Sequence, residues 1–153
     1  MDAIADFEDM LALLGEHGAR YLIVGGLAFI YHAKPRYTKD MDLWVDPAEA
    51  NIMRVNRALI EFPSPQLLTP GRREEILQLG VAPSRIDLLQ SLGDADFDVA
   101  WSRRVKDRYG SVDANWIDLD TLAAIKRAID HPRHQEDARI LDEVRRLRER
   151  DDD

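Results

Sequence analysis

The chain has 153 residues and contains no cysteine. That absence excludes disulfide bonds, a zinc site built from thiolates and a cysteine nucleophile. Long apolar runs are missing too, since none approaches the roughly 20 residues that span a bilayer. The first residues are acidic and lack the basic region of a signal peptide. We therefore expect a cytoplasmic protein with no membrane partner.

Positive charge is in the minority, with 21 lysines and arginines against 29 acids and a formal net charge of −8. This balance argues against a protein that coats nucleic acid non-specifically, although unevenly placed arginines leave a local basic groove open. The sequence shows no internal repeat, low-complexity linker or domain boundary. We expect residues 1–153 to form a single domain.

Residues 21–33 predict a buried strand, a turn and a helix. The apolar run 21–24 is typical of a strand, and Gly25 and Gly26 follow it where a helical run begins. Two glycines at such a junction would let a phosphate approach the backbone and meet the first amides of the helix. The alternative is a tight turn with no ligand.

The next apolar segment, residues 40–45, carries acids at alternate positions. In a strand, Asp40 and Asp42 share one face with Trp44, while the residues between them face the core. Neighbouring carboxylates repel each other, so we expect positive charge beside them, most economically a metal ion. A solvated edge strand is the alternative. Trp44 could stack on a base, although a hydrophobic contact is the commoner role.

A third acid, Asp87, lies in the apolar segment 85–89, where the same alternation turns it away from the core. Three carboxylates on one open face could hold two divalent ions, an arrangement used for phosphoryl transfer. Oxygen ligands without thiolates favour magnesium or manganese over zinc. Taken alone, Asp87 is more simply an exposed acid.

The remaining patterns predict helices and strands along the rest of the chain. They are a helix over about 3–15, a helix starting at Asp46-Pro47-Ala48-Glu49, an antiparallel pair over 76–81 and 85–89 that turns at 82–84, a short helix over 97–103, strands over 105–109 and 111–117, a helix capped by Asp118, and a last helix from about Gln135.

Three segments carry a family resemblance: Gly25-Gly26, the stretch Arg36-Tyr37-Thr38-Lys39-Asp40-Met41-Asp42-Leu43, and Arg85-Ile86-Asp87-Leu88-Leu89. Together they resemble the DNA polymerase β-like nucleotidyltransferase superfamily, most closely the small bacterial toxins of the AbiEii and MenT type. The likeness runs from about Phe7 to Leu147. It implies an α+β nucleotidyltransferase fold, in which a mixed sheet is flanked by helices and followed by C-terminal helices.

The resemblance also implies an activity. Such an enzyme moves a nucleoside monophosphate from a nucleoside triphosphate, for example ATP, to an acceptor hydroxyl and releases pyrophosphate. The acceptor could be an RNA 3′ end or a protein, and an antitoxin protein could be the partner. Asp40, Asp42 and Asp87 would be the catalytic residues and would hold Mg²⁺ or Mn²⁺, with Asp87 helping to deprotonate the acceptor. The alternative is an inactive nucleotide-binding or partner-regulating module of the same fold.

The resemblance further implies a nucleotide-binding set, which consists of Gly25, Gly26, Arg36, Thr38 and Lys126. Lys126 would reach the β- and γ-phosphates, or else it is a lysine that extends from an amphipathic helix into solvent. Two positions depart from the family pattern. Gly26 stands where many members have serine, and Glu136 stands where lysine is usual, so the phosphate or acceptor contacts near the last helix are open.

Overall fold

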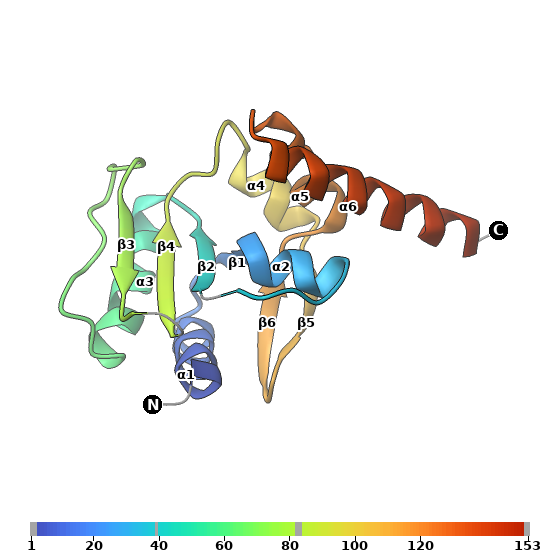
Figure 1. The fold of residues 1–153 in the computed structure, drawn as a ribbon. Helices are drawn as coiled ribbons and strands as arrows, with labels where there is room; N and C mark the ends of the chain where they lie inside the picture. The colour runs from blue at the N-terminus through green and yellow to red at the C-terminus, as the bar shows by residue number, and fades with distance from the viewer. Residues whose placement is uncertain (1–2, 39, 82–83, 152–153) are drawn as a thin grey trace.

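The computed structural model describes residues 3–38, 40–81 and 84–151. This part of the chain forms six helices and one six-stranded sheet (Figure 1). The helices are α1 (Ala3–Glu16), α2 (Gly25–His32), α3 (Glu49–Glu61), α4 (Phe97–Ser102), α5 (Leu119–Ala128) and α6 (Pro132–Asp151). The strands are β1 (Tyr21–Val24), β2 (Asp40–Val45), β3 (Ile76–Leu79), β4 (Arg85–Leu89), β5 (Val105–Tyr109) and β6 (Val112–Trp116). None of the described helices is long and apolar enough to cross a membrane.

The sheet is mixed and open, with strand order β3-β4-β2-β1-β6-β5. The pairs β3–β4 and β5–β6 are antiparallel, and β1 also pairs antiparallel with β2. The sequence predicts the β3–β4 pair, and it predicts β5 and β6 as strands. The β2–β4 and β1–β6 pairs are parallel. The expectation of a mixed α+β architecture is therefore confirmed. Because β2 and β4 lie side by side, the two acid-bearing segments are neighbours in the sheet.

The two faces of β2 differ in the way that its alternation predicts. Met41, Leu43 and Val45 are fully buried on one face, and Asp40 and Asp42 are partly exposed on the other. Trp44 shares the acidic face but is only 1% exposed, because Phe97 of α4 packs against it with ring centroids 5.2 Å apart. The hydrophobic alternative for Trp44 is therefore the correct one, and its ring is not free to stack on a base.

Helices cover both sides of the sheet. α1 and α3 pack against each other on the face that holds the apolar side of β2, while α2 packs on β1 and β2 and contacts α5 and α6. Figure 1 shows α6 extending well beyond the sheet, so that the two ends of the chain lie on different sides of the molecule. The α2–α5–α6 contact brings the C-terminal helices to the glycine turn.

Two helix starts differ from the sequence prediction. α3 begins at Glu49, because the Asp46 carboxylate accepts a hydrogen bond from the Ala48 N–H (3.0 Å) and holds a turn ahead of the helix. α6 begins at Pro132, three residues earlier than predicted, since proline fits the first position of a helix. The predicted turn at 82–84 falls partly on residues 82 and 83, which lie outside the described residues.

Candidate functional site

The parallel pairing of β2 with β4 brings the three predicted catalytic acids onto one face. In the register, Asp42 is opposite Asp87, and Asp40 is opposite Arg85. Asp87 is 7% exposed, whereas Asp40 and Asp42 are partly open to solvent. The acids are therefore grouped by the topology of the sheet, although they come from segments more than 40 residues apart.

The carboxyl group of Asp42 has a strongly altered environment. Its burial, followed by the negative charges of Asp87 and Asp40, raises the pKa of Asp42 from the ordinary value of 3.8 to about 6. Arg85 opposes this change but does not cancel it. The group of acids thus holds more negative charge than its own surroundings neutralise, which is the condition under which carboxylates take up a proton or a cation.

Arg85 supplies the cation that the acids contact within the chain. Its Nη2 donates a hydrogen bond to Asp40 Oδ2 at 2.6 Å, and its Nε lies 3.2 Å from Asp87 Oδ1. The sequence patterns predict no role for Arg85, although Arg85 lies two residues before Asp87 in a strand and must therefore share its face. That spacing was the available signal.

The donors in this group suit a divalent ion of the magnesium type, which prefers carboxylate oxygens. Asp40 Oδ1 is buried without a hydrogen-bond partner, which leaves one oxygen available for a ligand. Among the described residues, however, no set of three or more acids or histidines is arranged as a metal site. Arg85 lies against two of the three acids, so a metal held by all three requires the guanidinium to move.

The two glycines are required by close packing at the start of α2. Gly25 has φ of +65°, and a Cβ at that position would overlap the carboxylate of Asp42. A Cβ at Gly26 would lie 2.6 Å from Thr38 Oγ1. The glycines therefore let the start of α2 approach the acidic strand and the loop before it. The sequence patterns do not predict this packing role.

A cavity of about 260 Å³ opens beside the acids and collects the predicted nucleotide-binding residues. Its lining includes Gly25, Gly26, Arg36, Thr38 and Lys126, together with Asp42. Asp40 and Asp87 do not line it. The cavity is smaller than the roughly 300–1,000 Å³ of sites that enclose a whole drug-sized ligand, so it has room for only part of such a ligand.

The alternative role for Lys126, a side chain that extends into solvent, is wrong. Lys126 is 5% exposed, and its Nζ donates a hydrogen bond to Asp137 Oδ2 at 2.9 Å. Arg36 donates to the other oxygen of the same carboxylate at 2.8 Å. Burial works against ionisation of Asp137, yet the hydrogen bonds from Arg36 and Lys126 hold its pKa below the ordinary value. Asp137 therefore fixes both cations at the wall of the cavity.

The cavity is also lined by three residues of α6 to which the sequence patterns assign no role. They are Arg133, His134 and Asp137. His134 Nδ1 is buried without a hydrogen-bond partner, and burial, together with the charge of Lys126, lowers the pKa of this histidine. The four-residue spacing of Arg133 and Asp137 places them on one side of a helix, but nothing in the sequence indicates which side.

No family model matches this chain, and no curated protein matches it significantly. The functional assignment accordingly depends on the motif resemblance and on the geometry of the cavity and the acids.

Proposed function

We propose that this chain is a metal-dependent nucleotidyltransferase with a nucleotidyltransferase fold. The observation that carries the proposal is one cavity that combines a glycine turn, two cations and an acid from a group of three. Glycine amides and fixed cations bind phosphate, and grouped carboxylates bind the metal that accompanies a triphosphate.

In the proposed complex, Lys126 and Arg36 contact the β- and γ-phosphates of a nucleoside triphosphate, and the amides at Gly25 and Gly26 approach the phosphate chain. Thr38 borders the same space. Mg²⁺ or Mn²⁺ held by Asp40, Asp42 and Asp87 would neutralise charge on the phosphates and acceptor oxygen.

The reaction joins the acceptor oxygen to the α-phosphorus and breaks the bond from that phosphorus to the bridging oxygen of pyrophosphate. Asp87 accepts the proton of the acceptor hydroxyl, and pyrophosphate leaves with the electron pair of the broken bond. The cations that contact the β- and γ-phosphates stabilise the charge that develops there. The family resemblance suggests the acceptor, which is an RNA 3′ end or a protein. It also suggests an antitoxin protein as the partner.

The test is label transfer from each α-labelled nucleoside triphosphate, with Mg²⁺, total RNA and cell extract. Wild type should label one acceptor band, and Asp42→Asn should label none. Asp113→Asn is the matched control, because Asp113 is an exposed strand carboxylate outside the site. Equal labelling by wild type and Asp42→Asn would contradict the proposal.

A second candidate, nucleotide binding without transfer, is favoured by one observation. Arg85 pairs with Asp40 and Asp87, and Asp137 pairs with Lys126, so most of these charged groups already have a partner of opposite charge without catalytic ions. Binding of nucleotide and Mg²⁺ should raise the melting temperature under both candidates. Binding without transfer to any acceptor supports the second, and an unchanged melting temperature at millimolar nucleotide contradicts both.

A further inference from the structure

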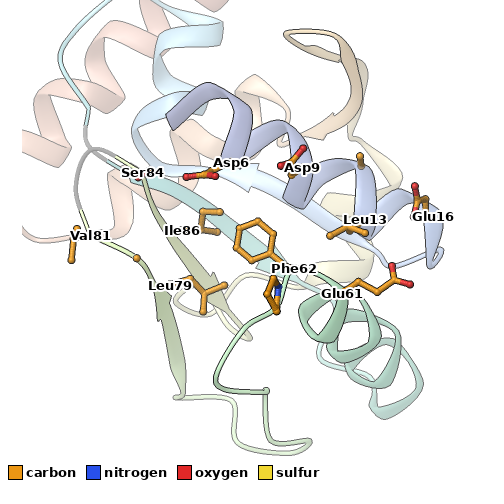
Figure 2. Close-up of a pocket in the computed structure, with 13 residues that line it drawn as sticks. Asp6, Asp9, Leu13, Glu16, Glu61, Phe62, Leu79, Val81, Ser84 and Ile86 are labelled. Carbon is orange, nitrogen blue, oxygen red and sulfur yellow. The ribbon is translucent and has the colours of Figure 1, made fainter. Parts of the chain in front are cut away.

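A groove of about 750 Å³ lies on the opposite face of the sheet from the three acids. It runs between α1, the end of α3 and the β3–β4 hairpin (Figure 2). Ile86 lines it, whereas Arg85 and Asp87, the neighbours of Ile86 in β4, face the other side. The groove is therefore a separate surface from the cavity at Gly25 and Gly26.

The floor of the groove is apolar. Phe62 lies in the middle of Figure 2, with Leu13 from α1 on one side of it and Leu79 and Ile86 on the other. Val81, at the hairpin end, is 77% exposed. Apolar side chains gathered in an open concave surface are typical of a site that another molecule covers.

The edge of the groove is acidic. Asp6, Asp9 and Glu16 line it from α1, and Glu61 lines it from α3. Figure 2 shows Glu16 and Glu61 near each other at one end and Asp6 toward the other. No lysine or arginine is among the described residues that line the groove.

These carboxylates are largely unneutralised. Glu61 Oε2 lies 3.0 Å from His17 Nε2, but in the described part of the chain no ion pair includes Asp6, Asp9 or Glu16. Four acids around an apolar floor favour an occupant with apolar side chains flanked by positive charge. In a two-fold contact, a second copy of this chain would bring the same acidic edge to this place, which disfavours that form of self-association.

The spacing of the wall residues indicates the shape of the occupant. Asp6, Asp9, Leu13 and Glu16 recur at intervals of three and four, so they form a row along one side of α1. The row covers residues 6–16, or about 15 Å of helix. A helix lying alongside presents its own side chains at the same repeat.

We propose that this groove binds a basic amphipathic α-helix of a partner protein, about three turns long. Its apolar stripe packs on Leu13, Phe62, Leu79 and Ile86, and its lysines or arginines face the acids of the edge. The proposal is independent of the nucleotidyltransferase assignment, since it uses the other face of the sheet.

The probe is a fluorescein-labelled 14-residue helical peptide with leucine at positions three and four apart and lysine elsewhere. One control peptide has the same composition in scrambled order, and a second has glutamate in place of lysine. We expect saturable binding of the amphipathic basic peptide by anisotropy, and at least tenfold weaker binding of both controls. Methyl chemical shifts of Leu13, Leu79 and Ile86 should move on binding.

Two variants test the location. Asp9→Lys combined with Glu16→Lys should weaken binding at least tenfold, and so should Val81→Lys. Their matched controls are Asp130→Lys combined with Glu149→Lys, which changes the net charge equally, and Val99→Lys, at another exposed valine. Both controls should bind as wild type does. These positions are exposed, so all four variants should fold, with circular dichroism as the check.

Several results would overturn the proposal. Equal loss in the groove variants and their charge-matched controls would mean attraction to net charge alone. Equal binding of the scrambled peptide, or no binding by wild type, would exclude an amphipathic helix as the occupant. A wild-type dimer in sedimentation that Val81→Lys dissociates would show that a second copy covers the groove instead.

Discussion

Asp42 and Asp87 are direct neighbours across the parallel strands β2 and β4, and neither has an arginine opposite it in the register. Arg85 is opposite Asp40 and reaches Asp87 from its own strand. Asp42 is therefore the acid of the three that the chain neutralises least, which is consistent with its raised pKa of about 6. The stability of the protein should depend on this imbalance.

Asp42→Asn should stabilise the metal-free protein at neutral pH. Between about pH 4 and pH 6 the folded state binds more protons at Asp42 than the unfolded state does, so this residue's contribution to stability falls as pH rises. At pH 7 the variant should gain roughly 1–3 kcal/mol, and the gain should disappear below about pH 4. Melting curves in EDTA from pH 4 to pH 7.5 measure this. A variant that melts below wild type at pH 7 would make Asp42 a structural acid.

Replacing Arg85 should have the opposite effect. Arg85→Met removes the cation between Asp40 and Asp87 and should cost about 1–2 kcal/mol, a modest value because 35% of the arginine side chain is exposed. The variant should also gain more in melting temperature from Mg²⁺ than wild type does, since the acids are left to the ion. Arg85→Lys, which keeps the charge, is the control. An equal Mg²⁺ effect in all three proteins would mean that the ion does not bind at these acids.

Asp137 should stabilise the C-terminal helices through its two cations. Asp137→Asn leaves the buried ammonium of Lys126 with only a neutral partner, which should cost about 3 kcal/mol or more in urea unfolding. The pKa of Asp137 is lowered in the folded state, so wild type should lose this contribution as pH falls below about 4, and the variant should not. Adding Lys126→Met should recover part of the loss. If the double variant is as unstable as the sum of the single ones, the pair is not coupled.

How much of this site the sequence could predict depends on the range of the interaction. Alternation within residues 40–45 predicts the face of Asp40 and Asp42, because side-chain direction in a strand is local. The pairing of Asp42 with Asp87 is not local: it needs β2 and β4 to be parallel neighbours, and the sequence predicts β3 as the partner of β4 without indicating a second one. The Arg36–Asp137 bond joins residues 101 positions apart and leaves no periodic signal.

The sequence predicts the first residues of α3 and α6 incorrectly for a related reason. Asp46-Pro47 has the composition of a helix start, but Asp46 is 8% exposed and its carboxylate holds the preceding turn and meets Arg20 at 3.4 Å. A tertiary contact therefore decides where α3 begins. At the other boundary, Gln135 donates hydrogen bonds to the carbonyls of Arg127 and Ile129, so one side chain completes the end of α5 from within α6.

Gly25→Ala should be costly for two separable reasons. The residue has φ of +65°, a conformation that costs an alanine about 1–2 kcal/mol, and its Cβ would in addition overlap the Asp42 carboxylate. Gly18 provides a matched control, because its φ is +63° and a Cβ there meets no atom within 4 Å. Gly18→Ala should therefore lose only the backbone contribution, and Gly25→Ala should lose clearly more in urea unfolding. Added to an Asp42→Ala background, Gly25→Ala should cost about as much as Gly18→Ala costs in wild type, since the carboxylate that a Cβ would overlap is gone. If Gly25→Ala costs as much in the Asp42→Ala background as in wild type, the helix start, and not the acid, limits the space at this turn.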